Sequence, residues 1–541
     1  MALSKSLFDA SVKRCPVKAV PNLLSPFPSQ SQQCPLRQDD PNPASGISSS
    51  SNNMNTNSPL IKSPRRMGPF GHFHLVLKPN SFRDALQNMG ALYDELGTNT
   101  VAIQPLPSFL TRFIPEANNI IYTKDENLIK HILKNEDKYP RRAGYLNDNI
   151  QAIQSDLGIG TDLFSTDGPE WHAHRKLVQK HLLSPEEVKQ FTHTVTQVAR
   201  DYVQLIHQIT SKNEGFMDDL KFRNTCFTFE STVALLYGVR NGTVTQDSIN
   251  DHKFHNYANS FVKLFETFQP LSFCPVHLMK SVGRLFWYNE AKRLYDNTLV
   301  QSRQFAESAM QASADSKCVW AKVLKSATDA DEEKLKCNLS AVLSGGLDTT
   351  ATQLLWTMQA LAEFPEEQEK LSRQIRDNLG SEPIDHDNVH RVGLARAVIK
   401  EAQRLYPLVG FFPRQPYTDV NYSDSETGHS ATIPAGSLIL IDNFNYSRDE
   451  KYFPEPLVFR PERWMREDDS EHFNKDRMFL AFGSGPRSCI GRRISELEMR
   501  IFIIELIRNF RLDLEGDAAS PIYSGIVIPD KTPKIRFTPR N

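Results

Sequence analysis

The sequence predicts a large, mainly α-helical domain with a minor β portion, and three observations support this. The chain has 541 residues, of which 39% are hydrophobic and 10% aromatic, so it can bury a large core. From about residue 82 onward the apolar pattern is mainly helical, and capping boxes at Thr123-x-x-Glu126 and Ser184-Pro185-x-Glu187 predict helix starts. Short β-rich runs lie between the helices, and the expected strands span residues 100–104, 119–122, 437–441 and 534–537.

Residues 1–66 differ in composition from the rest of the chain, because they are rich in Ser, Pro, Asn and Gln. We expect a transit peptide and a disordered linker over 1–66 and a folded domain over 67–541. A plain disordered linker stays open as an alternative, because Arg14 interrupts the apolar face that Leu3 and Leu7 would form. The first 38 residues are Ser-rich and carry Lys5, Lys13, Arg14, Lys18 and Arg37 against the single acid Asp9, as mitochondrial transit peptides do.

Composition excludes several classes of protein. Lys and Arg number 63 against 64 Asp and Glu, so the net charge of -1 provides no global basic field for binding nucleic acid. The seven cysteines are scattered without a C-x-x-C pair, which argues against a disulfide framework or a zinc knuckle and favours a reducing compartment. No run of 18 apolar residues is present, so we expect neither a membrane-spanning helix nor a secretory signal.

The most unusual predicted helix spans residues 332–361, where leucines recur near helical spacing around a glycine pair. Gly345 and Gly346 each cost about 1 kcal/mol relative to Ala in a helix interior, and the β-branched Thr349 and Thr350 follow them. A site at which local propensity is overridden is often functional. The alternative is close packing of a second helix against the glycines.

The strongest signal is the run Phe482-Gly-Ser-Gly-Pro-Arg487-Ser-Cys489-Ile-Gly491, which precedes a helical segment over 492–510. A thiolate that binds iron needs backbone N–H groups turned toward sulfur, and glycines permit the tight loop that turns them. The positive end of the following helix supports the same charge. Arg487 is placed to reach an anionic group at the edge of a ligand. A lone Cys is more often a small buried hydrophobe, but this combination of residues favours a ligand.

This run resembles the haem-binding loop of the cytochrome P450 family, and four further motifs resemble family motifs in the family's order. Each short motif is weak by itself, whereas five in order are specific, and the resemblance covers roughly residues 68–541. The four are Trp171-x-x-x-Arg175, Gly345-Gly346-Leu-Asp348-Thr349-Thr350, Glu401-x-x-Arg404 and Pro461-Glu-Arg463-Trp464.

The resemblance implies a haem b whose iron is bound by Cys489 and an enzyme that inserts one atom of O2 into a C–H bond. It implies that Asp348 and Thr349 deliver protons and that Glu401, Arg404 and Arg463 form a structural triad. The implied haem contacts are Trp171, Arg175, Arg414, Phe482, Arg487 and Cys489. By position, the substrate contacts would be Leu343, Ser344, Val409, Phe411, Phe412, Ile526 and Val527, whose apolar character suggests a lipophilic, sterol- or steroid-like substrate.

The segment from Arg492 to Met499, with the glycine pair before the acid and threonine, resembles the mitochondrial members of the family. This resemblance implies electrons from a small acidic two-iron ferredoxin with its reductase, and a place on the matrix side of the inner membrane. The cations that would receive the ferredoxin are Arg396, Lys400, Arg492 and Arg493, although solvated helix charges are an equal alternative. The aromatic run 268–288 predicts peripheral insertion into the membrane, with a core loop as the alternative.

Other functions stay open. A microsomal-type monooxygenase would need an N-terminal anchor. A haem-thiolate isomerase or dehydratase, or a non-catalytic haem protein, would have little use for the Asp348–Thr349 pair.

Overall fold

The computed structural model describes residues 61–64, 83–104, 120–142, 144–247, 252–273, 276–281, 287–312, 318–326, 332–423, 429–465 and 478–540. These all lie within one compact unit, Asn53–Asn541. Helices predominate and the strands are short, so the expected fold class, mainly α with a minor β portion, is confirmed.

The first half of the described chain is almost entirely helical after two short strands. Its elements are α2 (Ala85–Leu96), β1 (Thr100–Ile103), β2 (Ile120–Thr123), α4 (Glu126–Lys134), α5 (Gly144–Asp156), α6 (Gly168–Leu183), α7 (Pro185–Lys189), α8 (Thr192–Thr210), α9 (Leu220–Tyr237), α10 (His252–Phe273), α11 (Val276–Ser281), α12 (Tyr288–Ala312) and α13 (Val319–Ser326).

The second half carries the longest helix and most of the strands. Its elements are α14 (Glu332–Glu363), α15 (Pro365–Leu379), α16 (Gly393–Leu405), β3 (Phe411–Arg414), β4 (Val420–Ser423), β5 (Ser430–Ile433), β6 (Leu438–Asp442), α17 (Asn443–Ser447), α18 (Arg492–Asn509), β7 (Phe510–Leu514), β8 (Pro521–Ser524), β9 (Ile526–Pro529) and β10 (Ile535–Pro539), with 3-10 turns at Val389–Arg391, Pro461–Trp464 and Gly485–Arg487.

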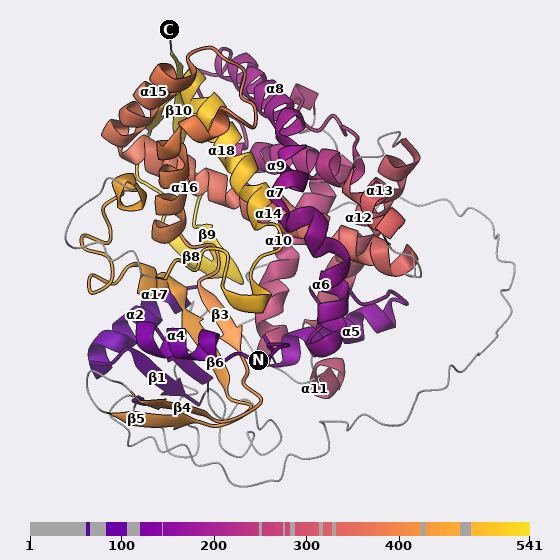
Figure 1. The fold of residues 1–541 in the computed structure, drawn as a ribbon, viewed down its shortest axis with the longest axis vertical. Helices are drawn as coiled ribbons and strands as arrows, with labels where there is room; N and C mark the ends of the chain where they lie inside the picture. Colours follow the sequence, from indigo (N-terminus) through magenta and orange to yellow (C-terminus); the bar gives the residue numbers. More distant parts are fainter. Residues whose placement is uncertain are drawn as a thin grey trace, which may run out of the picture. The chain divides into compact units, whose positions relative to one another are not determined.

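The main sheet brings distant parts of the chain together in the order β1-β2-β6-β3. β2 pairs in parallel with β6, so that Ile121 lies opposite Ile439, and β3 pairs antiparallel with β6. Three two-stranded sheets, β7 with β10, β4 with β5 and β8 with β9, complete the β portion. Figure 1 shows the main sheet with α2, α4 and α17 beside it in the lower part of the view and α8, α15, α16 and α18 above.

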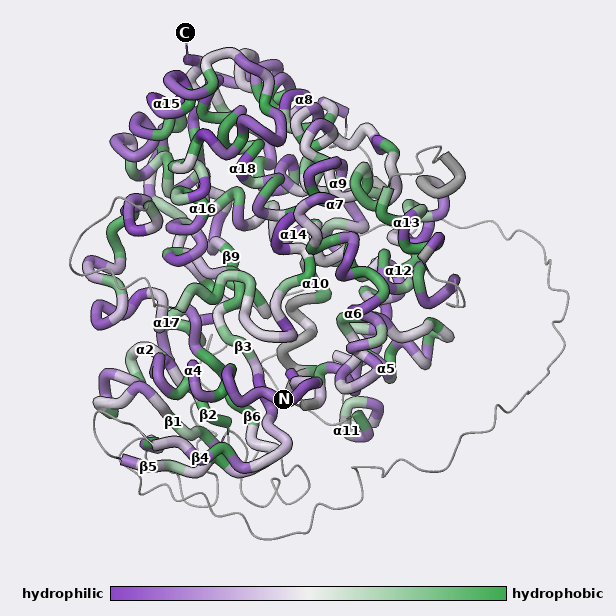
Figure 2. The backbone as a smooth tube through the Cα atoms, viewed as in Figure 1, coloured by the Kyte–Doolittle hydropathy of each residue, from purple (hydrophilic) through white to green (hydrophobic). Residues whose placement is uncertain are grey.

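Helix α14 lies at the centre of the core. Its second half packs with α8, α15, α16 and α18 in one apolar cluster, and its first half packs with α6, α9, α10 and α13 in another. Burial on several sides explains why this helix stays continuous through Gly345 and Gly346 despite their low helix propensity. In Figure 2 the surface helix α15 is largely hydrophilic, whereas β3 and β6 are largely hydrophobic.

Two boundaries differ from the prediction. The helix expected to be capped by Thr123 begins at Glu126, because Thr123 ends β2 and the Asp125 carboxylate caps α4 by accepting from the Leu128 N–H at 2.8 Å. Ile61 is 3% exposed, and Lys62 hydrogen-bonds through its backbone to the β1 edge. Residues 61–64, which the sequence assigned to the linker, therefore pack on the folded domain, whereas residues 1–60 and 65–82 lie outside the described residues.

The segment predicted to insert into a membrane, 268–288, is described only in part. Leu271 is fully buried in a core cluster with Met279 and Tyr288, so this leucine is not a membrane contact. Trp287 is 49% exposed. The side chains of Phe268, Phe273, Leu278, Leu285 and Phe286 lie outside the described part. Among the described helices, none is long and apolar enough to cross a membrane.

Candidate active site

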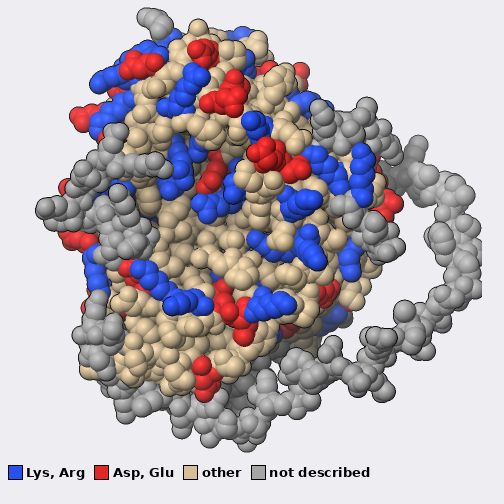
Figure 3. Space-filling view, in the orientation of Figure 1, with Lys and Arg blue, Asp and Glu red and all other residues tan. Residues whose placement is uncertain are grey.

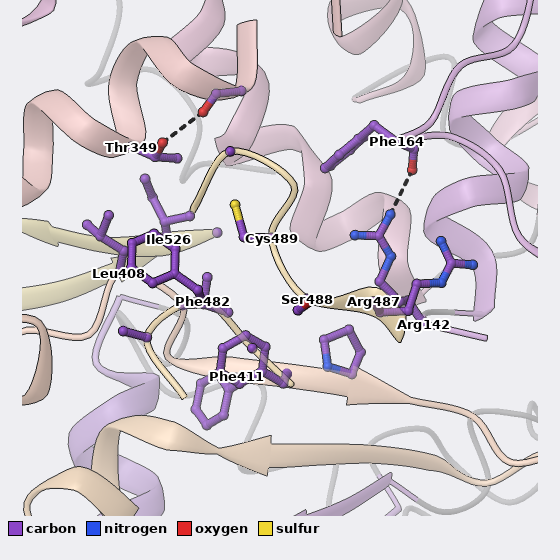
Figure 4. A pocket seen from close by; sticks show the side chains of 18 of the residues that line it. Arg142, Phe164, Thr349, Leu408, Phe411, Phe482, Arg487, Ser488, Cys489 and Ile526 are labelled. Atoms are coloured by element: carbon purple, nitrogen blue, oxygen red, sulfur yellow. Dashed lines mark hydrogen bonds between the residues drawn. The ribbon is translucent and has the colours of Figure 1, made fainter. Parts of the chain in front are cut away.

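A single cavity of about 790 Å³ joins most of the predicted site residues. It lies between α14, the loop that carries Cys489, the main sheet and helix α2. In Figure 4 the sulfur of Cys489 points into this cavity, with Ile526 and Phe482 on one side and Arg487 on the other.

The Cys489 loop is shaped by two glycines with positive φ, Gly483 at +69° and Gly485 at +72°. This turn brings the Cys489 N–H to the carbonyl of Phe482 at 2.8 Å. The backbone N–H groups of Gly491 and Arg492 donate to the thiol. Burial raises the pKa of Cys489, while these N–H groups and the Arg175 guanidinium act in the opposite direction. The side chain is nevertheless exposed, because its sulfur faces the cavity rather than protein atoms.

A cationic wall made of Arg142, Arg175, Arg414 and Arg487 lines one side of the cavity. Arg175 donates to the carbonyl of Ser488 at 2.9 Å, and Arg142 donates to that of Phe164 at 3.3 Å. Arg414 forms an ion pair with Glu136, and Arg487 forms one with Asp167.

Arg487 is tied to the protein more completely than the sequence suggested. Besides its ion pair, it donates to the carbonyls of Pro140 at 2.8 Å and Thr166 at 3.3 Å. Its guanidinium stacks on Trp171, with 3.8 Å between its Cζ and the ring centroid. Burial, followed by repulsion from Arg142, lowers the pKa of Arg487 to about 9. Arg487 therefore anchors the Cys489 loop to the start of α6 as well as facing the cavity.

Sequence reasoning missed Arg142. Burial lowers its pKa, and the positive charges of Arg414 and Arg175 contribute to the same shift. Within the described residues it has no ion pair, and it lines the cavity. None of the five motifs quoted above includes this position, so only its place beside Arg141 after an aromatic-proline pair could have drawn attention to it.

The two glycines of α14 have different surroundings. A Cβ at Gly345 would meet nothing within 4 Å, because this residue faces the cavity. A Cβ at Gly346 would lie 3.1 Å from Oγ1 of Thr232 on α9. Both interpretations of the glycine pair therefore hold, one at each residue: the first opens space in the cavity and the second allows close helix packing.

Thr349 and Asp348 face different environments on the same helix. Thr349 lines the cavity, and its hydroxyl donates to the Gly345 carbonyl at 2.7 Å. Asp348 is 1% exposed and turned away from the cavity, with its Oδ1 3.8 Å from Nζ of Lys221 on α9. Burial raises the pKa of Asp348, and Lys221 opposes that shift. The Oδ1 atom has no hydrogen-bond donor among the described groups.

Glu401, Arg404 and Arg463 meet as predicted, in a fully buried network. Arg404 donates to both oxygens of Glu401 at 3.0 and 2.9 Å, and Arg463 donates to Oε1 at 3.1 Å. Two further donors were not foreseen: the indole of Trp464 at 2.9 Å and the backbone N–H of Arg460 at 3.1 Å. All three predicted charged side chains are 0% exposed.

The predicted substrate contacts divide into two groups. Val409, Phe411, Phe412 and Ile526 line the cavity as expected. Leu343, Ser344 and Val527 do not: Leu343 and Val527 are 0% exposed in core clusters, and the Ser344 hydroxyl lies 3.4 Å from that of Tyr257. The helix register instead turns Ala341, Val342 and Gly345 toward the cavity. The apolar wall also includes Met89, Leu92, Ile103 and Ile120, which the sequence analysis missed.

The predicted cationic patch lies on α16 and α18. Arg396, Arg492 and Arg493 are exposed, whereas Lys400 is half-buried against the Trp464 ring at 5.1 Å. Burial and the neighbouring Arg396 lower the pKa of Lys400. Arg492 is paired with Glu496 at 3.1 Å. Figure 3 shows Lys and Arg side chains gathered over this part of the face, with acidic residues among them.

The residues at the cavity fit a haem. In the cationic wall, four guanidiniums share two carboxylates in direct ion pairs, which leaves positive charge for two propionates. The Trp171 indole is a further donor that lines the cavity, and no described group accepts from its N–H. The Cys489 thiol, turned toward the same space by backbone N–H groups, is a suitable iron ligand.

Comparisons with known proteins agree with this geometry. The family model described as Cytochrome P450 matches residues 97–537. Cytochrome P450 11B, mitochondrial, from Aquarana catesbeiana is 27% identical over 487 residues, which cover 88% of this chain and 86% of the relative. The mitochondrial cholesterol side-chain cleavage enzyme of Oncorhynchus mykiss is 25% identical over 517 residues, 90% of this chain and 95% of that enzyme. The same enzyme of Ovis aries is 29% identical over 432 residues, 76% and 78% of the two chains. The expected similarity to mitochondrial members is confirmed, and the chain belongs to the cytochrome P450 family and is a haem-dependent monooxygenase.

Proposed function

We propose that this monooxygenase hydroxylates a lipophilic, sterol- or steroid-like substrate with electrons from an acidic two-iron ferredoxin, on the matrix side of the inner mitochondrial membrane. The observation that carries this proposal is the cavity of about 790 Å³, in which an apolar wall faces the Cys489 loop and the cationic wall. Relatives named as cholesterol side-chain cleavage enzymes support the sterol class, and their mitochondrial names support the compartment.

Cys489 would bind the haem iron, and Trp171, Arg175, Arg414 and Arg487 would bind the propionates, with Phe482 against the macrocycle. Arg142 joins these donors. When bound, the haem supplies activation of O2 for insertion into a C–H bond. The Glu401 network would fix the side of the site opposite to α14, since its buried charges permit few alternative arrangements.

Protons would reach the cavity through Thr349. Its hydroxyl donates to the Gly345 carbonyl at rest and can rotate toward the cavity, where a donor is needed. Asp348 is the preceding residue on the helix, and its Oδ1, which has no donor among the described groups, lies 3.8 Å from Nζ of Lys221, which is 24% exposed. Lys221 and Asp348 thus form a route from the surface to the helix turn that carries Thr349. A raised pKa allows the Asp348 carboxyl to hold and release a proton nearer to neutral pH.

The ferredoxin would dock on Arg396, Lys400, Arg492 and Arg493. The chain's net charge of -1 gives no global attraction for an anionic carrier, so fast association requires a local patch. Two of these residues, Arg492 and Arg493, begin the helix that follows Cys489. Electrons arriving there have a short path to the thiolate side.

The deciding experiment compares electron donors. The purified holoenzyme should turn over with ferredoxin and its reductase but not with a microsomal diflavin reductase, and the rate should fall steeply with rising salt. Arg493→Glu should weaken ferredoxin binding and leave the CO spectrum intact. Arg511→Glu is the matched control, because Arg511 is also exposed but lies on β7. Turnover with the diflavin reductase alone would refute the mitochondrial class while leaving the monooxygenase assignment unchanged.

Localisation and membrane association need separate tests. Import into isolated mitochondria should remove part of residues 1–66, and the new N-terminus can be sequenced. Peripheral association through the surface around 268–288, where Trp287 is 49% exposed, predicts that the imported protein binds the inner membrane. Replacing Trp287 by Ser should shift the protein from the membrane pellet to the soluble fraction at neutral pH. Unchanged association would contradict this choice of surface.

A further inference from the structure

Two tyrosines stand out in the apolar part of the cavity. Tyr122 on β2 and Tyr523 on β8 both line it, among side chains such as Met89, Leu92 and Ile103. Helix α2 also contributes two polar side chains to the cavity, Asn88 and Glu95. Both are exposed, so water can reach them. The tyrosines are half-buried and face the enclosed space.

The two phenol rings are held in place by one phenylalanine. Phe411 makes an edge contact with Tyr122, with 5.6 Å between ring centroids, and another with Tyr523 at 5.3 Å. Phe411 lines the cavity and is one of the expected substrate contacts. Both phenols therefore border the same part of the cavity. Their orientation is set before any ligand binds, which lowers the entropy cost of using them.

Neither phenol hydroxyl has a hydrogen-bond partner among the described residues. Both hydroxyls face the cavity, so a ligand that excludes water from them without pairing with them loses free energy. Burial raises the pKa of both groups, that of Tyr523 to about 12, so both are neutral at physiological pH. A ligand group placed here should therefore be polar and uncharged.

The charge near Tyr122 favours a ligand hydroxyl over a ligand ketone. The Asp442 carboxylate, 0% exposed at the end of β6, contributes its negative charge to the raised pKa of Tyr122, whereas Tyr523 is neutral at physiological pH and adds no charge there. The potential at the Tyr122 oxygen is therefore negative. A ligand hydroxyl can donate into this potential while it accepts from the other phenol, whereas a ketone can only accept.

We infer that Tyr122 and Tyr523 form a recognition pair for a hydroxyl group of the substrate. This inference rests on the proposed function, because it assumes a lipophilic substrate in this cavity. The substrate class is thereby narrowed to lipophiles that carry a hydroxyl away from the reacting carbon. A site built to bind a hydroxyl rejects the analogue without it, because its own polar groups are then left unpaired.

The test measures the change in the haem absorption band as the ferric holoenzyme is titrated with cholesterol, with cholest-5-ene, which lacks the hydroxyl, and with cholesterol methyl ether. Cholesterol should bind at least about tenfold more tightly than cholest-5-ene, with the ether weaker than cholesterol. Tyr122→Phe and Tyr523→Phe should each weaken cholesterol binding by about 2- to 10-fold and leave cholest-5-ene unchanged.

The control is Tyr237→Phe, because the Tyr237 hydroxyl is buried, has no partner among the described residues and does not line the cavity. It should change neither affinity, and all three variants should keep the CO spectrum. Equal binding of the three ligands to the wild type, or a hydroxyl preference that survives in the double Phe variant, would overturn the inference alone. Failure of the wild type to bind any of the three would refute the sterol class of the proposed function, and the inference with it.

Discussion

The Glu401 network and the Asp348–Thr349 pair of α14 satisfy their polar groups in opposite ways. Both oxygens of Glu401 accept hydrogen bonds from Arg404, and Arg463, Trp464 and a backbone N–H add further donors. On α14, Oδ1 of Asp348 has no donor among the described groups, and the Thr349 hydroxyl is seen to bond only to the Gly345 carbonyl of its own helix within the described residues.

We interpret the Glu401 network as a region that maintains the structure of the site and the Asp348–Thr349 pair as a region that takes part in the reaction. The Glu401 carboxylate cannot move without losing several hydrogen bonds, so it is held rigidly, although Nη1 of Arg463 has no partner among the described residues. Polar groups without partners cost stability, but they are free to bind a ligand or move a proton. The contrast predicts that substitutions in the network change stability, whereas substitutions on the α14 face change reaction outcome.

The largest expected effect is at Cys489, which belongs to neither region. Cys489→Ser should remove the thiolate and with it the red-shifted Soret band of the reduced CO complex. Cys337→Ser is the matched control, because Cys337 is a buried thiol on α14 that accepts from Arg303 at 3.2 Å and does not line the cavity. A Cys489→Ser protein that keeps the band would show that another residue binds the iron.

The next effect tests the rigid region. Glu401→Gln removes the negative charge that two fully buried guanidiniums share, and breaking such a pair costs about 3–5 kcal/mol of unfolding free energy. Urea unfolding and haem content after purification measure the loss. Glu382→Gln, at an exposed pair with Arg391, should change stability little. Equal stability of the two variants would mean that the network is not the structural anchor proposed here.

The reactive face is tested by Thr349→Ala. The variant should fold and retain haem, but product formed per electron pair should fall by about an order of magnitude or more, with peroxide released instead. Thr357→Ala is a close control, because the Thr357 hydroxyl also donates to its own helix, at 2.8 Å to the Gln353 carbonyl, but lies outside the cavity. Unchanged coupling in Thr349→Ala would assign the hydroxyl a structural role.

The sequence predicted this contrast only in part. Cys489, the Glu401 triad and the α14 motif could be predicted, because each is a short motif with a stated chemistry. Trp464 and Arg142 could not, because their roles arise from tertiary contacts that no local pattern records. Asp348 was expected beside Thr349, but one helix position corresponds to about 100° of rotation, so the two side chains face different environments.

The helices and strands, too, could be predicted where a local sequence pattern is strong and were missed where tertiary contacts decide. Helix α14 and strands β1, β2, β6 and β10 were predicted within one or two residues, because their apolar patterns are strong. Strand β3 was missed, since its Phe411-Phe412-Pro413-Arg414 sequence has no alternation and pairs only because β6 lies beside it. Leu343, Ser344 and Val527 were assigned to the cavity by position, and a rotation of the helix or strand turns each into the core.

Glu498 on α18 is a buried carboxyl that borders the cavity, and its Oε1 has no donor among the described groups. Burial raises its pKa from 4.5 to about 8, so the folded protein holds a proton that the unfolded chain releases. Stability due to this group is therefore fully present below about pH 4.5 and is lost as pH rises through 8. Glu498→Gln cannot ionise, so its melting temperature should exceed that of the wild type by a margin that grows from pH 5 to about 8. Parallel curves would show that Glu498 has a partner in solution.

The smallest expected effect is at the glycine pair, Gly345 and Gly346. It tests whether a glycine on the cavity side of α14 lowers the stability of the helix while leaving volume open in the cavity. Replacing Gly by Ala in a helix interior stabilises it by about 0.5–1 kcal/mol when nothing obstructs the methyl group. Gly345→Ala meets nothing within 4 Å, so it should gain this amount, while its methyl projects into the cavity and weakens ligand binding. Gly346→Ala approaches Thr232 to 3.1 Å, so displacement of α9 should cancel most of the gain. Urea unfolding of both holoenzymes, with spectral titration of ligand binding, measures the two effects. If Gly345→Ala were no more stable than Gly346→Ala, the opening at residue 345 would not be a stability cost of the reactive face.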